Sequence, residues 1–160
     1  MRNGRGFTLL ELMVACVIAG VVLAITVPGF LNFRSSLLRN QVKWGLIADL
    51  RYARQLAVTK HRSVIVAFGN GSATTNITTY TIHTDTNGNR AKDTGELVLN
   101  RKLPNGALLT NVALTPPDSV IFDLSGSLWP ATLGGQLQFK GPQGNVDTLN
   151  VSAIGMVFHP

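Results

Sequence analysis

The sequence has 160 residues, of which 45% are hydrophobic and 14% are charged, and its formal net charge is +6. This length fits one modest domain plus a membrane element and excludes two large hydrophobic cores. Cys16 is the one cysteine, so an intrachain disulfide is excluded. No nucleophile and base pair, catalytic metal spacing or nucleotide-binding loop is evident, and we therefore do not expect an enzyme.

The first long element is an apolar run. Arg2 and Arg5 precede it, Glu11 lies near its start, and no charged side chain occurs from Leu12 to Phe33. A helix needs about 20 apolar residues to cross a bilayer, so residues 7–33 are predicted to form a membrane helix. A cleaved secretory signal is the alternative interpretation of this run. Signals of that kind, however, have a shorter apolar core that is followed by a small-x-small cleavage site.

Glu11 is the unusual residue of this run. A carboxylate within a membrane-length stretch costs several kcal/mol unless a partner neutralises it, which indicates a functional role.

Flanking charges do not decide the membrane topology of this helix. Long domains are translocated with little regard to such charges, which favours a cytoplasmic N-terminus. Farther along, Pro28 removes a backbone donor, so we expect a kink or a locally melted turn there.

After Phe33 the apolar positions continue with helical spacing, which predicts an amphipathic helix over residues 34–62. Ile47 falls among the polar positions and Asp49 falls on the apolar side. The predicted buried face consists of Leu38, Val42, Leu46, Leu50, Ala53 and Ala57. Seven basic residues and one acidic residue occur between Leu31 and Arg62. They form either a solvated face or a contact with lipid headgroups, acidic subunits or nucleic acid.

Residues 63–160 change to short apolar runs separated by turn residues, which predicts β-strands. The fold class is therefore α+β, with a long N-terminal helix, half membrane and half amphipathic, packed on an antiparallel β-sheet domain. The expected strands are Ser63–Phe68, Thr78–Thr84, Leu97–Leu103, Ala107–Leu109, Ser119–Asp123, Gln136–Lys140, Thr148–Val151 and Met156–Phe158.

The stretch from Gly6 to Val14, read as GFTLLELMV after two arginines, resembles the leader and helix start of type IV pilins and type II secretion pseudopilins. The resemblance implies a leader of residues 1–6, cleavage between Gly6 and Phe7 by a prepilin peptidase, and N-methylation of Phe7. It implies a single-pass protein of the bacterial inner membrane, with residues 63–160 periplasmic, which assembles with other pilins. Without the leader, 12 basic and 8 acidic residues leave a net charge of +4.

The same resemblance implies a partner for Glu11, namely the amine that cleavage frees at Phe7 of a neighbouring subunit. Such a pair is better suited to fixing the register between neighbouring subunits than to adding stability, because removing one partner leaves an uncompensated charge. The alternative is a glutamate that snorkels to the interface near the helix start.

Residues 49–58, DLRYARQLAV, followed by Lys60-His61-Arg62 and a strand, resemble the minor pilin and pseudopilin H branch, often labelled FimT, FimU or GspH. Major pilins usually carry a C-terminal disulfide loop, which this sequence lacks. The resemblance implies a minor subunit that helps initiate or cap a type IV pilus. Two alternatives stay open: a type II secretion pseudopilin H, and a DNA-binding minor pilin for DNA uptake.

The segment from Asp85 to Glu96 contains oxygen-bearing side chains at EF-hand positions one, three, five, nine and twelve, which are Asp85, Asn87, Asn89, Asp93 and Glu96. This spacing predicts a structural calcium site. Against it, Arg90 occupies the sixth position, where an EF-hand has glycine, and the flanking elements are strands. A polar hairpin loop with Asp and Asn turn hydrogen bonds is the other interpretation.

The C-terminal segment resembles the last strand pair of the H branch. Some DNA-binding members carry arginines just after the glycine, where this sequence has Met156 and Phe158, so DNA is a possible partner that this strand does not support. Trp44 and Trp129 could stack on bases, but buried or interface packing is the stronger expectation for lone tryptophans.

Overall fold

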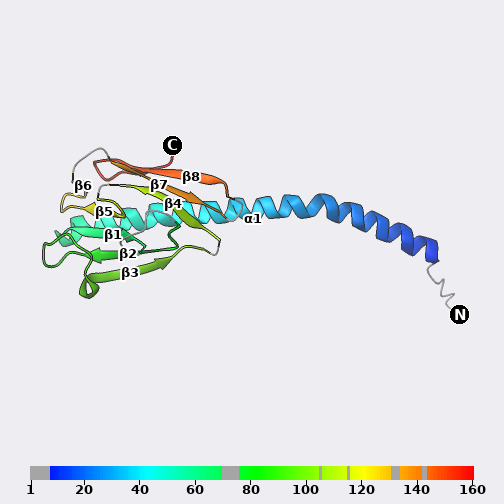
Figure 1. Ribbon diagram of the computed structural model, residues 1–160, viewed down its shortest axis with the longest axis horizontal. Coiled ribbons are helices and arrows are strands. Elements are labelled where there is room, and N and C mark those ends of the chain that lie inside the picture. The colour runs from blue at the N-terminus through cyan, green and yellow to red at the C-terminus, as the bar shows by residue number, and fades with distance from the viewer. Residues whose placement is uncertain (1–7, 70–75, 105, 115, 131–133, 142–143) are drawn as a thin grey trace. The chain divides into compact units, whose positions relative to one another are not determined.

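The computed structural model describes residues 8–69, 76–104, 106–114, 116–130, 134–141 and 144–160 (Figure 1). One long helix, α1, runs from Leu9 to Lys60 and enters both of the units into which the chain divides. The first unit comprises residues 1–35 and the second comprises residues 36–160. Most of the internal packing lies in the second unit, which contains all the strands of the described residues.

Two antiparallel sheets form the second unit together with the C-terminal half of α1 (Figure 1). The first sheet has the order β3-β2-β1-β5-β6, and the second has the order β4-β7-β8-β9. A bridge between Ile77 and Leu109 connects β4 to the segment before β2. The strands are β1 (Val64–Phe68), β2 (Thr79–Thr84), β3 (Leu97–Lys102), β4 (Leu108–Ala113), β5 (Ser119–Phe122), β6 (Leu128–Trp129), β7 (Gly135–Lys140), β8 (Val146–Val151) and β9 (Val157–Phe158). The predicted fold class is confirmed.

The core lies between α1 and the two sheets. Side chains of α1 that recur every three or four residues are buried, as the helical period requires: Val42, Leu46, Leu50, Ala53 and Ala57. Alternate residues of β1 meet this face, among them Val64, Val66 and Phe68, which are 0% exposed. Burying one leucine or phenylalanine contributes about 1.5–3 kcal/mol, so this packing holds the helix on the sheets.

Asp49 has a specific reason to lie on the apolar side of α1. Its Oδ2 accepts hydrogen bonds from the Tyr80 hydroxyl of β2 at 2.6 Å and from Arg101 Nε of β3 at 3.1 Å. Burial, and then the hydrogen bond to Asp49, raises the pKa of Tyr80, so this hydroxyl stays protonated and donates. The carboxylate thus ties the helix to two strands of the first sheet.

Most strand ends differ from the predicted ones by one or two residues, and larger differences concern β4, β6, Ile47 and Leu38. β4 extends to Ala113, because its pairing with β7 continues beyond Leu109. β6, a two-residue strand, was not predicted, since so short a segment has no period. Ile47 is buried although its helical position is among polar residues. Leu38 is half-buried, whereas the helical period predicts that it is buried.

Two glycines bring the C-terminal turn close to α1. Gly155, with φ +74°, lies so near the turn at Gly126 that a Cβ atom on it would be 2.2 Å from the Gly126 carbonyl oxygen. The same oxygen accepts a hydrogen bond from Arg54 Nε of α1 at 3.0 Å. A side chain at Gly155 would therefore displace a carbonyl that the helix holds in place.

A matched pair of substitutions tests this contact. Gly155 and Gly144 both have positive φ, but a Cβ on Gly144 would meet nothing within 4 Å. Gly144→Ala should cost about 1–2 kcal/mol of unfolding free energy from backbone strain alone. Gly155→Ala should cost at least about 2 kcal/mol more, because the backbone must move. Urea unfolding of the full chain in a neutral detergent measures both, and equal losses would refute the close contact.

Candidate functional site

The start of α1 is a capped helix end. Thr8 Oγ1 accepts a hydrogen bond from the backbone N–H of Glu11 at 3.2 Å, and the Thr8 carbonyl accepts one from Leu12 at 3.2 Å. Thr8 and Glu11 have the spacing of a capping box, in which a threonine caps the helix and a glutamate follows three residues later. The sequence analysis missed this role of Thr8, although the Thr-x-x-Glu pattern before an apolar run is its usual signal.

The Glu11 carboxylate is exposed and has no ion pair or hydrogen bond within the described residues. Gly6 and Phe7 lie outside the described residues, so cleavage between them and methylation of Phe7 stay predictions, as does the pairing of Glu11. The structure thus provides a free carboxylate in the first turn of the helix, and within the chain's described part nothing neutralises it.

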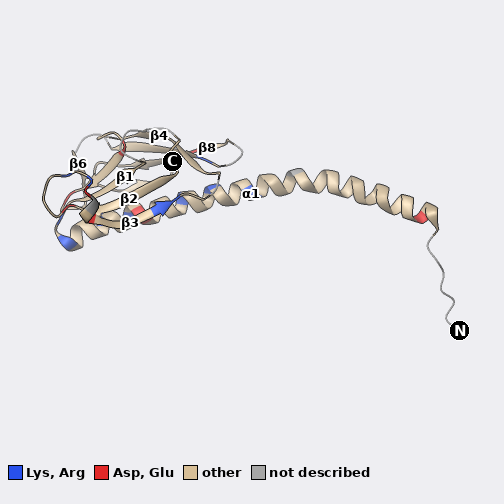
Figure 2. Cartoon of the chain, turned by 60° about the horizontal axis from the view of Figure 1, so that its bottom comes forward, with Lys and Arg blue, Asp and Glu red and all other residues tan. Residues whose placement is uncertain are grey.

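An uncovered apolar surface follows Glu11. Glu11 is the one charged residue from Leu9 to Phe33 (Figure 2). The large hydrophobic side chains along this stretch are half or more exposed. The helix is long and apolar enough to cross a membrane. The backbone remains helical at Pro28, and the predicted kink there stays a prediction. This surface is suited to lipid or to the apolar helices of other subunits.

The loop from Asp85 to Glu96 is held by hydrogen bonds within itself. Asp85 accepts the backbone N–H groups of Gly88 at 2.6 Å and Arg90 at 3.0 Å. Asn87 and Asn89 each accept a backbone N–H two residues later, and both donate their amides to Asp93 Oδ2 at 2.8 Å. These are the turn hydrogen bonds that the hairpin-loop interpretation predicts.

Two acidic side chains of this loop, Asp93 and Glu96, favour their charged forms. Hydrogen bonds from the Asn87 amide, and then from the Asn89 amide, lower the pKa of Asp93. The Thr86 hydroxyl and backbone N–H lower the pKa of Glu96. Within the described residues no three Asp, Glu, His or Cys side chains lie close enough to hold a metal ion.

Two details of the loop nevertheless resemble a cation site. Arg90 has φ +54°, so the sharp turn expected to need glycine forms with arginine. Glu96 is 8% exposed, and its buried Oε2 atom has no hydrogen-bond partner. A buried charged oxygen without a partner is costly, and a cation would relieve that cost.

The C-terminal edge carries apolar side chains. Met156 directly precedes β9, the edge strand of the second sheet, and Phe158 ends it; the two side chains are 53% and 47% exposed. Ile154 is similarly exposed. This edge has no basic side chain between residues 152 and 158 and does not favour a polyanion.

Neither tryptophan is buried, so packing at an interface is the alternative of the expectation that stays open. Trp44 is 61% exposed on α1, because its helical position lies outside the buried face. Trp129 is 38% exposed in β6, with the Arg90 guanidinium 4.6 Å from its ring centroid. Packing of these rings at an interface stays a prediction.

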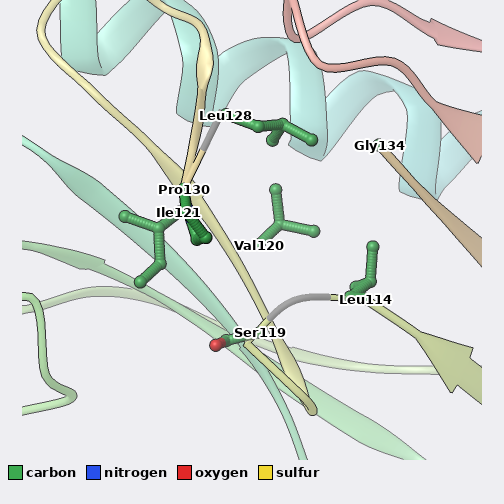
Figure 3. Close-up of a pocket in the computed structure, with 7 residues that line it drawn as sticks. All are labelled: Leu114, Ser119, Val120, Ile121, Leu128, Pro130 and Gly134. Atoms are coloured by element: carbon green, nitrogen blue, oxygen red, sulfur yellow. The ribbon is translucent and has the colours of Figure 1, made fainter. Parts of the chain in front are cut away.

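The cavity drawn in Figure 3 lies between β5, β6 and the segment after β4. Leu114, Val120 and Leu128 are among the apolar side chains that line it. Its volume is about 10 Å³, which is close to the space of a single water molecule. It is a packing void and too small to bind a substrate.

Comparison with solved structures supports this architecture. Two crystal structures of the type IV minor pilin FimU from Pseudomonas aeruginosa are similar, with TM-scores of 0.57 and 0.56 and identities of 20% and 16%. Each match covers 76% of this chain and 90% or 91% of that chain. At these identities the likeness establishes the fold. No curated protein matches the sequence.

Two family models match the sequence. The model described as the prokaryotic N-terminal methylation motif matches residues 1–27, which include the capped helix start and Glu11. The model described as type II transport protein GspH matches residues 45–155, which include the core-facing part of α1 and most of both sheets. The chain therefore belongs to the GspH family, and its N-terminus carries the prokaryotic N-terminal methylation motif.

Proposed function

We propose that this protein is a minor pilin that helps initiate or cap a type IV pilus. Membership of this family implies assembly with other pilin-like subunits. The observation that carries the proposal is the uncovered apolar stretch of α1 with the free Glu11 carboxylate in its first turn. Such a surface needs apolar neighbours and one positive charge, and a filament core of pilin-like helix starts supplies both.

In the proposed assembly, a prepilin peptidase removes residues 1–6 and Phe7 receives a methyl group on its new amine. That amine, four residues before Glu11, would meet the Glu11 carboxylate of a neighbouring subunit. In an apolar environment the two charges attract strongly, and a mismatched register leaves both unpaired. The pair therefore selects one axial position of each incoming subunit.

The proposed location is the bacterial inner membrane, with residues 36–160 in the periplasm and later in a surface filament. The apolar stretch supports membrane anchoring. The basic residues that follow it, Arg34 and Arg39, do not oppose this orientation, because long domains are translocated with little regard to flanking charge.

A type II secretion pseudopilin H that contacts partner pseudopilins or secreted proteins is the second candidate. The family model that matches residues 45–155 favours it. Both candidates use the same helix and the same carboxylate, so the identity of the subunits that co-purify with the full chain distinguishes them. DNA uptake is the third candidate, and the apolar edge at Met156 and Phe158 does not favour it.

Substitution of the carboxylate tests the pairing. Glu11→Gln keeps the size of the side chain and removes its charge, so the protein should be inserted and processed normally but should be lost from sheared filaments by at least about tenfold. Immunoblots of the membrane and filament fractions measure this. Filament incorporation equal to wild type would contradict the pairing.

Thr8→Ala is the matched control, because it removes the helix cap and leaves the carboxylate. Loss of a cap costs about 1 kcal/mol of helix stability, which a helix as long as α1 tolerates. Thr8→Ala should therefore enter filaments nearly as well as wild type. If both variants fail equally, helix capping and not the charge of Glu11 explains the phenotype.

We also propose calcium as a structural ligand of the loop from Asp85 to Glu96. The unpartnered Glu96 Oε2 and the left-handed Arg90 support it. In the described geometry the amides of Asn87 and Asn89 donate hydrogen bonds to Asp93. Calcium binding therefore requires the side chains of Asp93 and Glu96 to move towards the ion. Calcium would then supply the positive partner that the buried Glu96 Oε2 atom lacks.

Thermal unfolding of the full chain with calcium or with chelator tests this proposal. At a calcium concentration of 100 times Kd, the folded state gains about 2.7 kcal/mol and Tm rises by several degrees. Asp93→Asn should abolish the rise, whereas Asp118→Asn, which removes a carboxylate outside the loop, should retain it. An unchanged Tm in the wild type would reject the site, even if Glu11 is essential.

A further inference from the structure

The first sheet has a free edge along β3. This six-residue strand is the outermost one of its sheet, and within the described residues it pairs on one side only, with β2 (Figure 1). Its side chains are mostly exposed, and those of Leu97 and Val98 are 48% and 42% exposed. An open edge of this length can accept a strand from another molecule through main-chain hydrogen bonds.

The hydrogen-bond pattern shows which backbone groups face the free edge. The Leu103 N–H, directly after β3, donates to the Thr78 carbonyl at 2.8 Å. Bonded and non-bonded pairs alternate along an antiparallel ladder, so Arg101, two residues earlier, also bonds to β2. Asn100 and Lys102 therefore direct their N–H and C=O groups away from β2. The edge thus offers two donors and two acceptors to an incoming strand.

A hollow of about 310 Å³ lies between the C-terminal end of β3 and α1. On the helix side it is lined by Gly45 and Ala48, which are exposed, and a Cβ atom on Gly45 would meet nothing within 4 Å. The buried residues Leu46 and Leu103 also contribute to the lining and make it partly apolar. A strand added to β3 would place alternate side chains in this hollow.

The charge of the edge favours an acidic strand. β3 contains Arg101 and Lys102 and no acidic residue, and Figure 2 shows these basic residues at the end of β3 beside α1. Asp49 accepts a hydrogen bond from Arg101, but Lys102 has neither a hydrogen bond nor an ion pair within the described residues. Opposite charges on neighbouring strands contribute about 0.2–1 kcal/mol per pair, whereas like charges destabilise the pairing.

A second copy of this chain is a poor occupant of the edge. It would bring its own Arg101 and Lys102, and each chain has a formal net charge of +6. Basic side chains on an edge strand are a common means of preventing identical edges from pairing. A different subunit avoids this conflict, and membership of the family implies that such subunits are neighbours in an assembly.

We propose that the free edge of β3 binds an extended, acidic segment of a neighbouring pilin-like subunit as an additional strand. The segment bonds to the outward backbone groups of Asn100 and Lys102 and places apolar side chains in the hollow beside Gly45 and Ala48. Its Asp or Glu side chains face the basic end of β3. The proposal rests on the proposed filament function, but it uses neither Glu11 nor the apolar stretch of α1.

A photoreactive amino acid at Val98 tests the proposal in cells that contain the complete filament system. Ultraviolet light should join it to a segment of a pilin-like subunit that contains Asp or Glu, as mass spectrometry of the linked peptide identifies. The same amino acid at Asn111, which is exposed on β4 of the second sheet, is the matched position and should not capture that segment.

Two pairs of variants, each combined with the photoreactive Val98 position, separate backbone pairing from charge. Asn100→Pro removes one outward N–H and should lower the adduct yield at least about fivefold, whereas Asn100→Ala should lower it less than about twofold. Lys102→Glu should lower the yield at least about threefold, and Lys102→Arg should retain it. Urea unfolding in neutral detergent checks the folding of each variant. The Lys102 pair leaves the backbone unchanged and decides the question even if Asn100→Pro fails to fold.

The proposal is overturned if Lys102→Glu gives the wild-type yield, or if a folded Asn100→Pro variant behaves like Asn100→Ala. Adducts between tagged and untagged copies of this chain would show self-pairing and would likewise overturn it. If the protein is present in sheared filaments but Val98 forms no adduct with a pilin-like subunit, the β3 proposal alone fails. Absence of the protein from the filaments would contradict the proposed function as well.

Discussion

Burial of one face of α1 is the constraint on which the rest of the structure depends. Val42, Leu46 and Leu50 pack in one buried cluster with side chains of β1 and its neighbours, and this cluster is the main core of the second unit. Both sheets contribute side chains to this cluster, and a small second cluster of Ile65, Ala67 and Ile121 lies in the first sheet. The Asp49 carboxylate and the Arg54 guanidinium then tie the helix to the first sheet and to the turn between β5 and β6. The same helix thus supports the domain with its second half, while no described residue covers its first half.

That division explains how a single helix combines two roles. In residues 36–60, one apolar face is buried against the sheets, and the exposed face carries polar and basic groups together with Leu37, Trp44, Tyr52 and Val58. In residues 9–33, apolar side chains face outward on every side and Glu11 is the lone charge. The first arrangement is complete in the isolated chain, whereas the second requires other molecules. A family of filament subunits is consistent with this contrast.

The sequence predicted features that depend on local period and missed those that depend on distant partners. The buried face of α1 and most strands followed from helical and strand spacing. Asp49 looked misplaced, because its partners Tyr80 and Arg101 lie 31 and 52 residues away. β6 was missed because two residues carry no period, and the stacking of Arg90 on Trp129 had no local signal. Glu11 was identifiable from its charge alone, but its helix cap was overlooked.

The central claim is that the start of α1 lies against the starts of other pilin-like subunits. A photoreactive amino acid in place of Leu12, next to Glu11, tests this most directly in cells that contain the complete filament system. The account predicts ultraviolet-induced adducts that contain the processed N-terminal peptide of a neighbouring subunit, with a methylated first residue. Adducts with lipid alone, or with proteins that lack such an N-terminus, would contradict it.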